Sequence, residues 1–87
     1  MDIEFDARKD EANKAKHGLS LADAVELDLA SAAVVSDDRN AYGETRYRAF
    51  GRIDGLGYCL VFSHRTEKVR VISFRRCHER EMARYDR

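Results

Sequence analysis

Two short turn signals separate three strand-like segments in the second half of this chain, and this spacing constrains the fold more than any other feature. The segments are Thr45–Ile53, Tyr58–Ser63 and Lys68–Arg75. Asp54-Gly55 is a hairpin signal, and Thr66-Glu67 predicts a second tight turn. Because connections this short join antiparallel neighbours, the three segments are expected to form a meander.

The first half of the chain is predicted to begin with a strand and a helix. Ile3–Phe5 alternates apolar and acidic residues, which favours a strand. Asp6 is a suitable N-cap for a helix over Ala7–His17, and Gly18 fits the position that ends it. The apolar stripe of this mostly polar helix consists of Ala12 and Ala15, with Leu19 just beyond its end. We expect the helix to cover an edge of the sheet through that stripe.

A second helix and a further strand are predicted to follow. Ser20 is the N-cap, with Asp23 three residues later as a weak capping box. The apolar stripe at helical spacing is Leu21, Ala24, Val25 and Leu29. Over Ala32–Ser36 the period changes to two, which predicts a short buried strand. Cys77–Tyr85 is predicted to be a closing helix.

Together these elements predict one α+β domain spanning residues 1–87, in the order β-α-α-β-β-β-β-α. The sheet is expected to be antiparallel, with the helices packed on one face. The other face would then be left to water or to a partner.

Formal net charge is zero, but the charge is divided unequally along the chain. Residues 1–43 carry five basic and ten acidic side chains, whereas residues 44–87 carry eleven basic and six acidic ones. The arginines of the predicted strands are Arg46, Arg48, Arg52, Arg70 and Arg75. Since alternate residues of a strand share a face, we expect a sheet face that carries arginines. Such a face is a candidate phosphate-binding surface.

Composition and motifs argue against several classes of protein. No apolar run approaches the roughly 20 residues that span a bilayer, and the acidic N-terminus is unlike a signal peptide. Cys59 and Cys77 do not make a disulfide framework, which indicates a reducing, cytoplasmic compartment. Neither stands with His64 or His78 at zinc-site spacing, and no glycine-rich phosphate loop occurs. We therefore expect no metal and no cofactor.

Several short motifs occur in a fixed order along nearly the whole chain. They are Phe5-Asp6, Asn13-x-x-Lys16-His17-Gly18-Leu19-Ser20, the Asp37 turn, Glu44-x-Arg46-Tyr47, Gly51, the Arg65 turn, Arg70-Val71-Ile72-Ser73-Phe74-Arg75, Glu79-Arg80-Glu81 and Tyr85. Each is common alone, but the ordered set resembles the BrnT ribonuclease toxins of bacterial type II toxin–antitoxin systems. Phe74 and Cys77 depart from the family, which usually has a small residue at both positions, and Phe74 is expected to crowd the sheet face.

The resemblance implies a RelE-like fold and an endoribonuclease that acts on RNA and inhibits translation. It also implies a cognate antitoxin protein that neutralises the toxin and carries the DNA-binding element. Operator DNA would then be bound only through the antitoxin. A homodimer, or a heterotetramer with the antitoxin, is compatible with this scheme.

RNA can be cleaved without a metal ion. The 2′-hydroxyl attacks the adjacent phosphorus, a base takes its proton, an acid protonates the leaving 5′-oxygen, and cations offset the charge on the phosphoryl oxygens. The residues assigned to catalysis are His17, Lys16, Glu44, Arg65 and Arg75. The residues assigned to RNA binding are Arg46, Arg48, Arg70 and Tyr85. His17 is the first choice for acid or base, because its ordinary pKa is near neutrality.

Each assignment has a structural alternative. His17 and Lys16 would also be favourable at a helix C-terminus without any catalytic role. Glu44 could simply pair with Arg46, and strand arginines can serve only to keep a face soluble. Tyr85 would be a core residue if it packs with the closing helix.

Arg75 is preferred over Arg65 as the phosphate ligand, because a strand end holds a guanidinium more firmly than a turn does. Its alternative is a pair with Glu79 or Glu81. For the whole protein, the alternative function is a non-catalytic protein-binding module, or an inactivated toxin relative. Steep salt dependence would separate RNA binding from an apolar protein interface.

Overall fold

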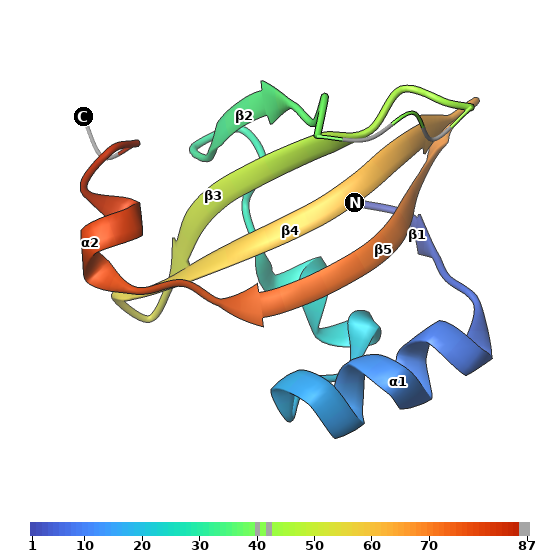
Figure 1. Cartoon of the computed structure of the whole chain (residues 1–87), viewed down its shortest axis with the longest axis horizontal. Coiled ribbons are helices and arrows are strands. Elements are labelled where there is room, and N and C mark those ends of the chain that lie inside the picture. The colour runs from blue at the N-terminus through green and yellow to red at the C-terminus, as the bar shows by residue number, and fades with distance from the viewer. Residues whose placement is uncertain (40, 42, 86–87) are drawn as a thin grey trace.

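The computed structural model describes residues 1–39, 41 and 43–85 and contains one five-stranded sheet in the order β1-β5-β4-β3-β2 (Figure 1). Its elements are β1 (Ile3–Glu4), α1 (Ala7–His17), η1 (Leu21–Glu26), β2 (Ala33–Ser36), β3 (Tyr47–Ile53), β4 (Leu56–Arg65), β5 (Lys68–Arg76) and α2 (Glu79–Met82). The predicted α+β class and element order are confirmed, with a 3₁₀ helix as the second helical element. No helix in the described residues has both the length and the apolar character needed to cross a membrane.

The sheet is mixed, so the prediction of a purely antiparallel sheet is wrong. Strands β2 to β5 do form the predicted antiparallel meander. β1 instead pairs in parallel with β5, with Ile3 opposite Val69 and Glu4 opposite Arg70. The parallel pairing is possible because no hairpin joins β1 to β5: two helical segments and three strands lie between them in the chain.

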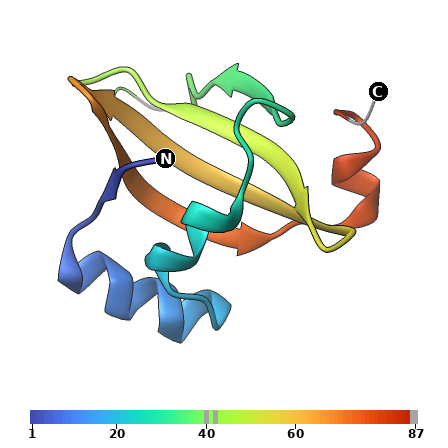
Figure 2. The ribbon, with the colours of Figure 1, turned by 180° about the vertical axis from the view of Figure 1, so that it is seen from behind.

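The first face of the sheet packs against α1 and η1, and Figure 2 shows η1 and the segment after it crossing this face. The core on this side consists of Leu21, Ala24, Leu27, Ala49, Leu60, Phe62, Val69, Val71 and Phe74. Gly51 allows Leu27 to approach β3, because a Cβ there would lie 2.8 Å from Leu27 Cδ1. Phe74, where the family usually has a small residue, is buried in this core. It therefore does not crowd the opposite face of the sheet.

The opposite face, called the open face below, carries Arg48, Cys59 and Arg75. The prediction that all helices pack on one face is wrong, because α2 covers one end of the open face. Its Met82 side chain is buried directly over Gly57, where any Cβ would overlap it. A second, smaller core forms there from Phe50, Cys59, Val61, Cys77 and Met82.

A bulge in β5 decides which arginines share the open face. Val61 lies opposite Ser73, but the next residue, Phe62, lies opposite Val71, so Ile72 has no partner in the register. Arg70 and Arg75 are five residues apart, and regular alternation would place them on opposite faces. The extra residue restores them to the same face, opposite Ser63 and Cys59 respectively.

The helices differ from expectation in which residues they bury. α1 has the predicted bounds and caps, but Ala12 and Ala15 are exposed, and its buried residues are Asp10 and Asn13. η1 is shorter than predicted, and Val25 is 47% exposed. The residues that it and its C-cap bury are Leu21, Ala24 and Leu27. That spacing of three matches the three residues per turn of a 3₁₀ helix. α2 is likewise shorter than the predicted helix over Cys77–Tyr85.

Candidate functional site

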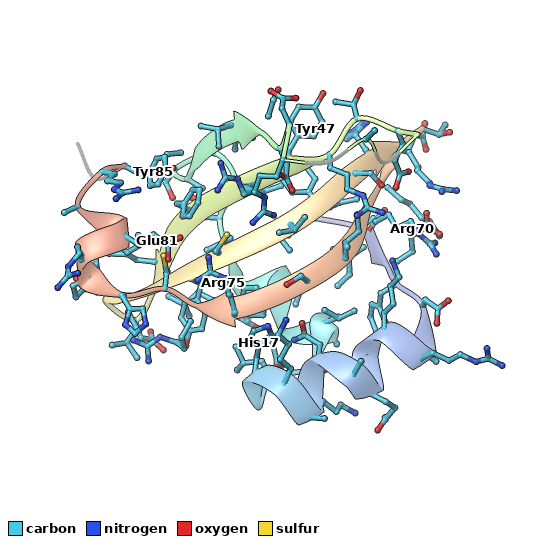
Figure 3. All side chains as sticks on the ribbon, in the orientation of Figure 1. His17, Tyr47, Arg70, Arg75, Glu81 and Tyr85 are labelled. Carbon is cyan, nitrogen blue, oxygen red and sulfur yellow. The ribbon has the colours of Figure 1, made fainter. Side chains whose placement is uncertain are left out.

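A shallow hollow of about 270 Å³ lies on the open face where the C-terminal end of α1 meets the sheet. Its charged and polar lining residues are Lys16, His17, Asp37, Arg39, Arg46, Ser73 and Arg75. Its remaining lining residues are Cys59, Val61 and Ile72. The hollow therefore combines an imidazole, an ammonium and three guanidinium groups from four separate parts of the chain. Figure 3 shows His17 at the end of α1 close to Arg75 on β5.

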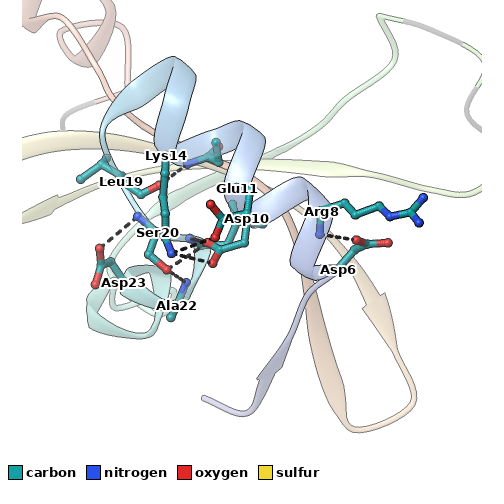
Figure 4. A network of polar contacts seen from close by, with 11 residues as sticks. Asp6, Arg8, Asp10, Glu11, Lys14, Leu19, Ser20, Ala22 and Asp23 are labelled. Carbon is teal, nitrogen blue, oxygen red and sulfur yellow. Dashed lines mark hydrogen bonds and ion pairs between the residues drawn. The ribbon is translucent and has the colours of Figure 1, made fainter.

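The position of α1 is fixed first by Asp10. Its carboxylate accepts hydrogen bonds from the backbone N–H of Leu21 at 2.7 Å and from the hydroxyl of Ser20 at 3.0 Å. The Leu21 bond is the main reason that the pKa of Asp10 lies below its ordinary value. Ser20 in turn caps η1 through the predicted capping box with Asp23. Figure 4 shows this network, which ties the two helical segments together.

Asn13 fixes α1 to the sheet. Its side-chain amide donates to the carbonyl oxygens of Leu19 and Phe74, both at 2.8 Å, and its Oδ1 accepts from the backbone N–H of Phe74 at 3.1 Å. Since residues four apart share a helix face, His17 lies on the same side of α1 as Asn13. The Asn13 bonds therefore hold His17 beside β5 at the edge of the hollow.

His17 is half-buried, and its surroundings favour the neutral imidazole. Burial lowers the pKa of His17 below its ordinary value of 6.5, and the positive charges of Lys16 and Arg75 lower it further. A neutral imidazole can accept a proton, so the environment suits a general base at neutral pH. Lys16 lines the same hollow, because both side chains lie at the C-terminal end of α1.

Arg75 is held by Glu81. Its Nη1 and Nη2 donate to the two carboxylate oxygens of Glu81 at 3.1 and 2.9 Å. Glu81 also accepts from the thiol of Cys77 at 3.0 Å. The bonds from Arg75 and then Cys77 lower the pKa of Glu81 to about 2. Arg75 thus forms the ion pair with Glu81 that was its predicted alternative role. It also lines the hollow.

The Glu81 carboxylate is expected to make stability depend on acid pH. A carboxyl whose pKa is lowered from 4.5 to about 2 on folding contributes stability that is complete above pH 4.5 and is lost as pH falls toward 2. The free energy of unfolding of the wild-type chain should therefore fall more steeply over this range than that of Glu81→Gln. Denaturant unfolding at a series of pH values measures this difference. Parallel curves for the two proteins would contradict it, and Glu79→Gln, at an exposed ion pair with Arg52, serves as control.

Glu44 lies outside the hollow and links two arginines. Its carboxylate is 3.3 Å from Arg46 Nε and 3.7 Å from Arg65 Nη2. Arg46 lines the hollow, whereas Arg65 ends β4 and is exposed. Of the residues assigned to catalysis, His17, Lys16 and Arg75 thus line the hollow. Glu44 does not line it but contacts Arg46, which does.

The other residues assigned to RNA binding, Arg48, Arg70 and Tyr85, do not line the hollow. Arg70 approaches Glu4 of β1 at 4.0 Å. The guanidinium of Arg48 lies over the ring of Phe50 at 5.6 Å, and its buried Nε has no hydrogen-bond partner among the described residues. Tyr85 stacks on Phe50 with ring centroids 3.9 Å apart, as its alternative role in the core predicted.

Sequence reasoning missed Asp37 and Arg39 as parts of the site. The Asp37 carboxylate is fully buried and accepts from Arg39 Nε at 2.6 Å and Nη2 at 2.8 Å. The backbone N–H of Asp37 also donates to the carbonyl of Arg46 at 2.7 Å, which joins this turn to β3. An aspartate followed two residues later by an arginine was the available signal, but it is equally typical of a plain turn.

The cysteines are not suited to nucleophilic chemistry. Burial raises the pKa of both thiols, that of Cys77 to about 12. In the described part of the chain, no three His, Cys, Asp or Glu side chains gather in a way that could hold a metal ion.

The chain matches a model of a known protein family. A family model described as the ribonuclease toxin, BrnT, of type II toxin–antitoxin systems matches residues 5–81. The match spans the hollow and the elements that build it. No curated protein sequence matches the chain significantly.

Proposed function

Since the chain belongs to the BrnT family of ribonuclease toxins of type II toxin–antitoxin systems, we propose that it cleaves RNA in the hollow on the open face without a metal ion. The observation that carries the proposal is the convergence of Lys16, His17, Arg46 and Arg75 on one site. These groups supply proton transfer and positive charge, the two requirements of metal-free phosphodiester cleavage.

In this mechanism the scissile phosphate lies in the hollow against Arg75 and Arg46. Neutral His17 takes the proton of the 2′-hydroxyl as the 2′-oxygen bonds to phosphorus. The bond from phosphorus to the 5′-oxygen breaks, and Lys16 gives that oxygen a proton. The products are a 2′,3′-cyclic phosphate and a 5′-hydroxyl end. The two arginines offset the negative charge that develops on the phosphoryl oxygens in the transition state.

The remaining assigned residues act around this centre. Glu44 orients Arg46 and Arg65 by pairing with both. Arg48 and Arg70, on the same face, bind phosphates that flank the scissile one. Tyr85 already has Phe50 against one side of its ring, so a base would stack on the other side.

Family membership implies a cognate antitoxin as the protein partner. In the cell, we propose that cleavage of RNA inhibits translation and that the antitoxin prevents it. Operator DNA would be bound through the antitoxin.

The proposed chemistry is tested with a short RNA and its 2′-deoxy counterpart, each incubated with the purified chain in EDTA. We expect the RNA to be cleaved at an undiminished rate, to leave a 2′,3′-cyclic phosphate, and the deoxy strand to stay intact. Binding of the deoxy strand should weaken steeply as salt rises. Cleavage that is lost in EDTA and restored by Mg²⁺, or cleavage of the deoxy strand, would refute the mechanism.

A further inference from the structure

The hydrogen bonds of Arg75 leave one edge of its guanidinium for a ligand. A guanidinium has five N–H donors. In Arg75, Nη1 donates to the carbonyl of Arg76 at 3.2 Å and to Glu81 at 3.1 Å, and Nη2 donates to Glu81 at 2.9 Å. The donors that remain without an acceptor in the described residues are Nε–H and the second N–H of Nη2. These two point in parallel along one side of the guanidinium, which is the geometry that binds two phosphate oxygens at once.

Glu81 is itself held rigidly. Its oxygen Oε1 accepts from the Cys77 thiol at 3.0 Å, and the raised pKa of Cys77, about 12, keeps that thiol protonated and able to donate. The next residue, Met82, is 1% exposed and fixes α2 over Gly57. The carboxylate therefore has a defined position relative to β5. Its two bonds to Arg75 fix the orientation of the guanidinium in turn.

We propose that Glu81 is a positioning residue for RNA cleavage: it occupies the end of the Arg75 guanidinium and so turns the Nε–Nη2 edge toward the scissile phosphate. This inference rests on the proposed function and names a further residue that it needs. Glu81 also carries a negative charge beside the phosphate site, so it should weaken binding of the substrate while it fixes the geometry of the transition state.

The test is Glu81→Gln, which keeps the side chain's size and removes its charge. The glutamine amide would present an N–H toward Arg75, so the two-bond arrangement cannot form. We expect kcat to fall by about 10- to 100-fold, the scale of a misplacement near 1 Å, while KM stays the same or falls because a repulsive charge is gone. A residue that contacts substrate would instead raise KM. Partial unfolding would lower kcat only in proportion to the fraction of the variant that is unfolded at the assay temperature, which circular dichroism measures.

Two variants serve as matched comparisons. Glu79→Gln, on the same short helix but in an exposed pair with Arg52, should keep wild-type kcat and KM. Glu81→Asp keeps the charge and should recover part of the lost kcat. If Glu81→Gln shows wild-type kcat and KM, or is faster than wild type, the positioning role is refuted.

A readout that is independent of cleavage separates the inference from the proposed function. In NMR spectra of arginine side chains at low temperature, the Nη protons of Arg75 should be resolved in the wild-type chain and averaged in Glu81→Gln. Resolved Nη protons in the variant would refute the positioning role. Absence of cleavage by the wild-type chain, with Arg75 still ordered by Glu81, would instead refute the proposed function.

Discussion

His17→Ala is expected to reduce the rate of RNA cleavage by about 10²–10⁴-fold and to leave the fold unchanged, because this is the usual contribution of one proton-transfer partner. His17 lines the hollow at the end of α1, and its lowered pKa keeps it neutral at pH 7 and ready to accept the 2′-hydroxyl proton. Initial rates of cleavage of a short RNA measure the effect, with circular dichroism to confirm the fold.

The pH dependence of cleavage and a control variant at a second histidine add to this test. Cleavage by the wild-type chain should rise with pH and level off through a midpoint below 6.5, since the base must lose its proton and its pKa is lowered. His64→Ala, at an exposed position near the end of β4, should keep the wild-type rate. A His17→Ala protein with the wild-type rate would remove His17 from the mechanism.

Asn13→Ala is expected to lower the free energy of unfolding by about 3–5 kcal/mol, because three hydrogen bonds are lost and buried backbone groups of Phe74 are left without partners, each at about 1–3 kcal/mol. Asn13 is only 6% exposed, so water cannot readily replace its amide. A loss of this size is a large part of the 5–15 kcal/mol that stabilises a typical domain. Denaturant unfolding at neutral pH measures it.

Two further variants separate hydrogen bonding from packing at this position. Asn13→Leu restores the volume but not the bonds, so it should be about as destabilising as Asn13→Ala. Glu11→Ala, at an exposed position on the same helix, should change stability by less than about 0.5 kcal/mol. If Asn13→Leu were as stable as wild type, packing and not the amide would be what holds α1 to the sheet.

The parts of the fold that could be predicted are those governed by local signals. Asp54 and Gly55 in the first turn and Thr66 in the second have the positive φ angles of tight turns, and the two turns fix the meander. Caps at Asp6, Gly18 and Ser20 placed the start or end of the helical segments. None of these signals depends on distant parts of the chain.

What could not be predicted depends on distant contacts. The parallel pairing of β1 with β5 joins the two ends of the chain, and no residue in Ile3–Glu4 specifies its partner. The buried stripe of α1 is polar, so a search for apolar periodicity selects Ala12 and Ala15 instead. The bulge at Ile72 has no sequence marker, although it decides the face on which Arg75 lies.

The candidate site was predicted in part for the same reason. Residue types and the family resemblance indicated Lys16, His17, Arg46 and Arg75, and the structure brings these four together. Glu81 entered only as an alternative partner for Arg75, because its role depends on where α2 folds back over β5. Arg39 was missed because its buried partner, Asp37, looks like a turn residue in sequence.

The bonds between Asn13 and Phe74 join residues 61 positions apart. During synthesis the first helix is made long before β5, so the bonds that hold His17 beside the sheet cannot form at that stage. The hollow is completed only when Arg75 has been added, and Arg75 gains its partner only when Glu81 follows. A polypeptide whose synthesis stops before β5 therefore lacks the hollow, whatever the state of its first helix.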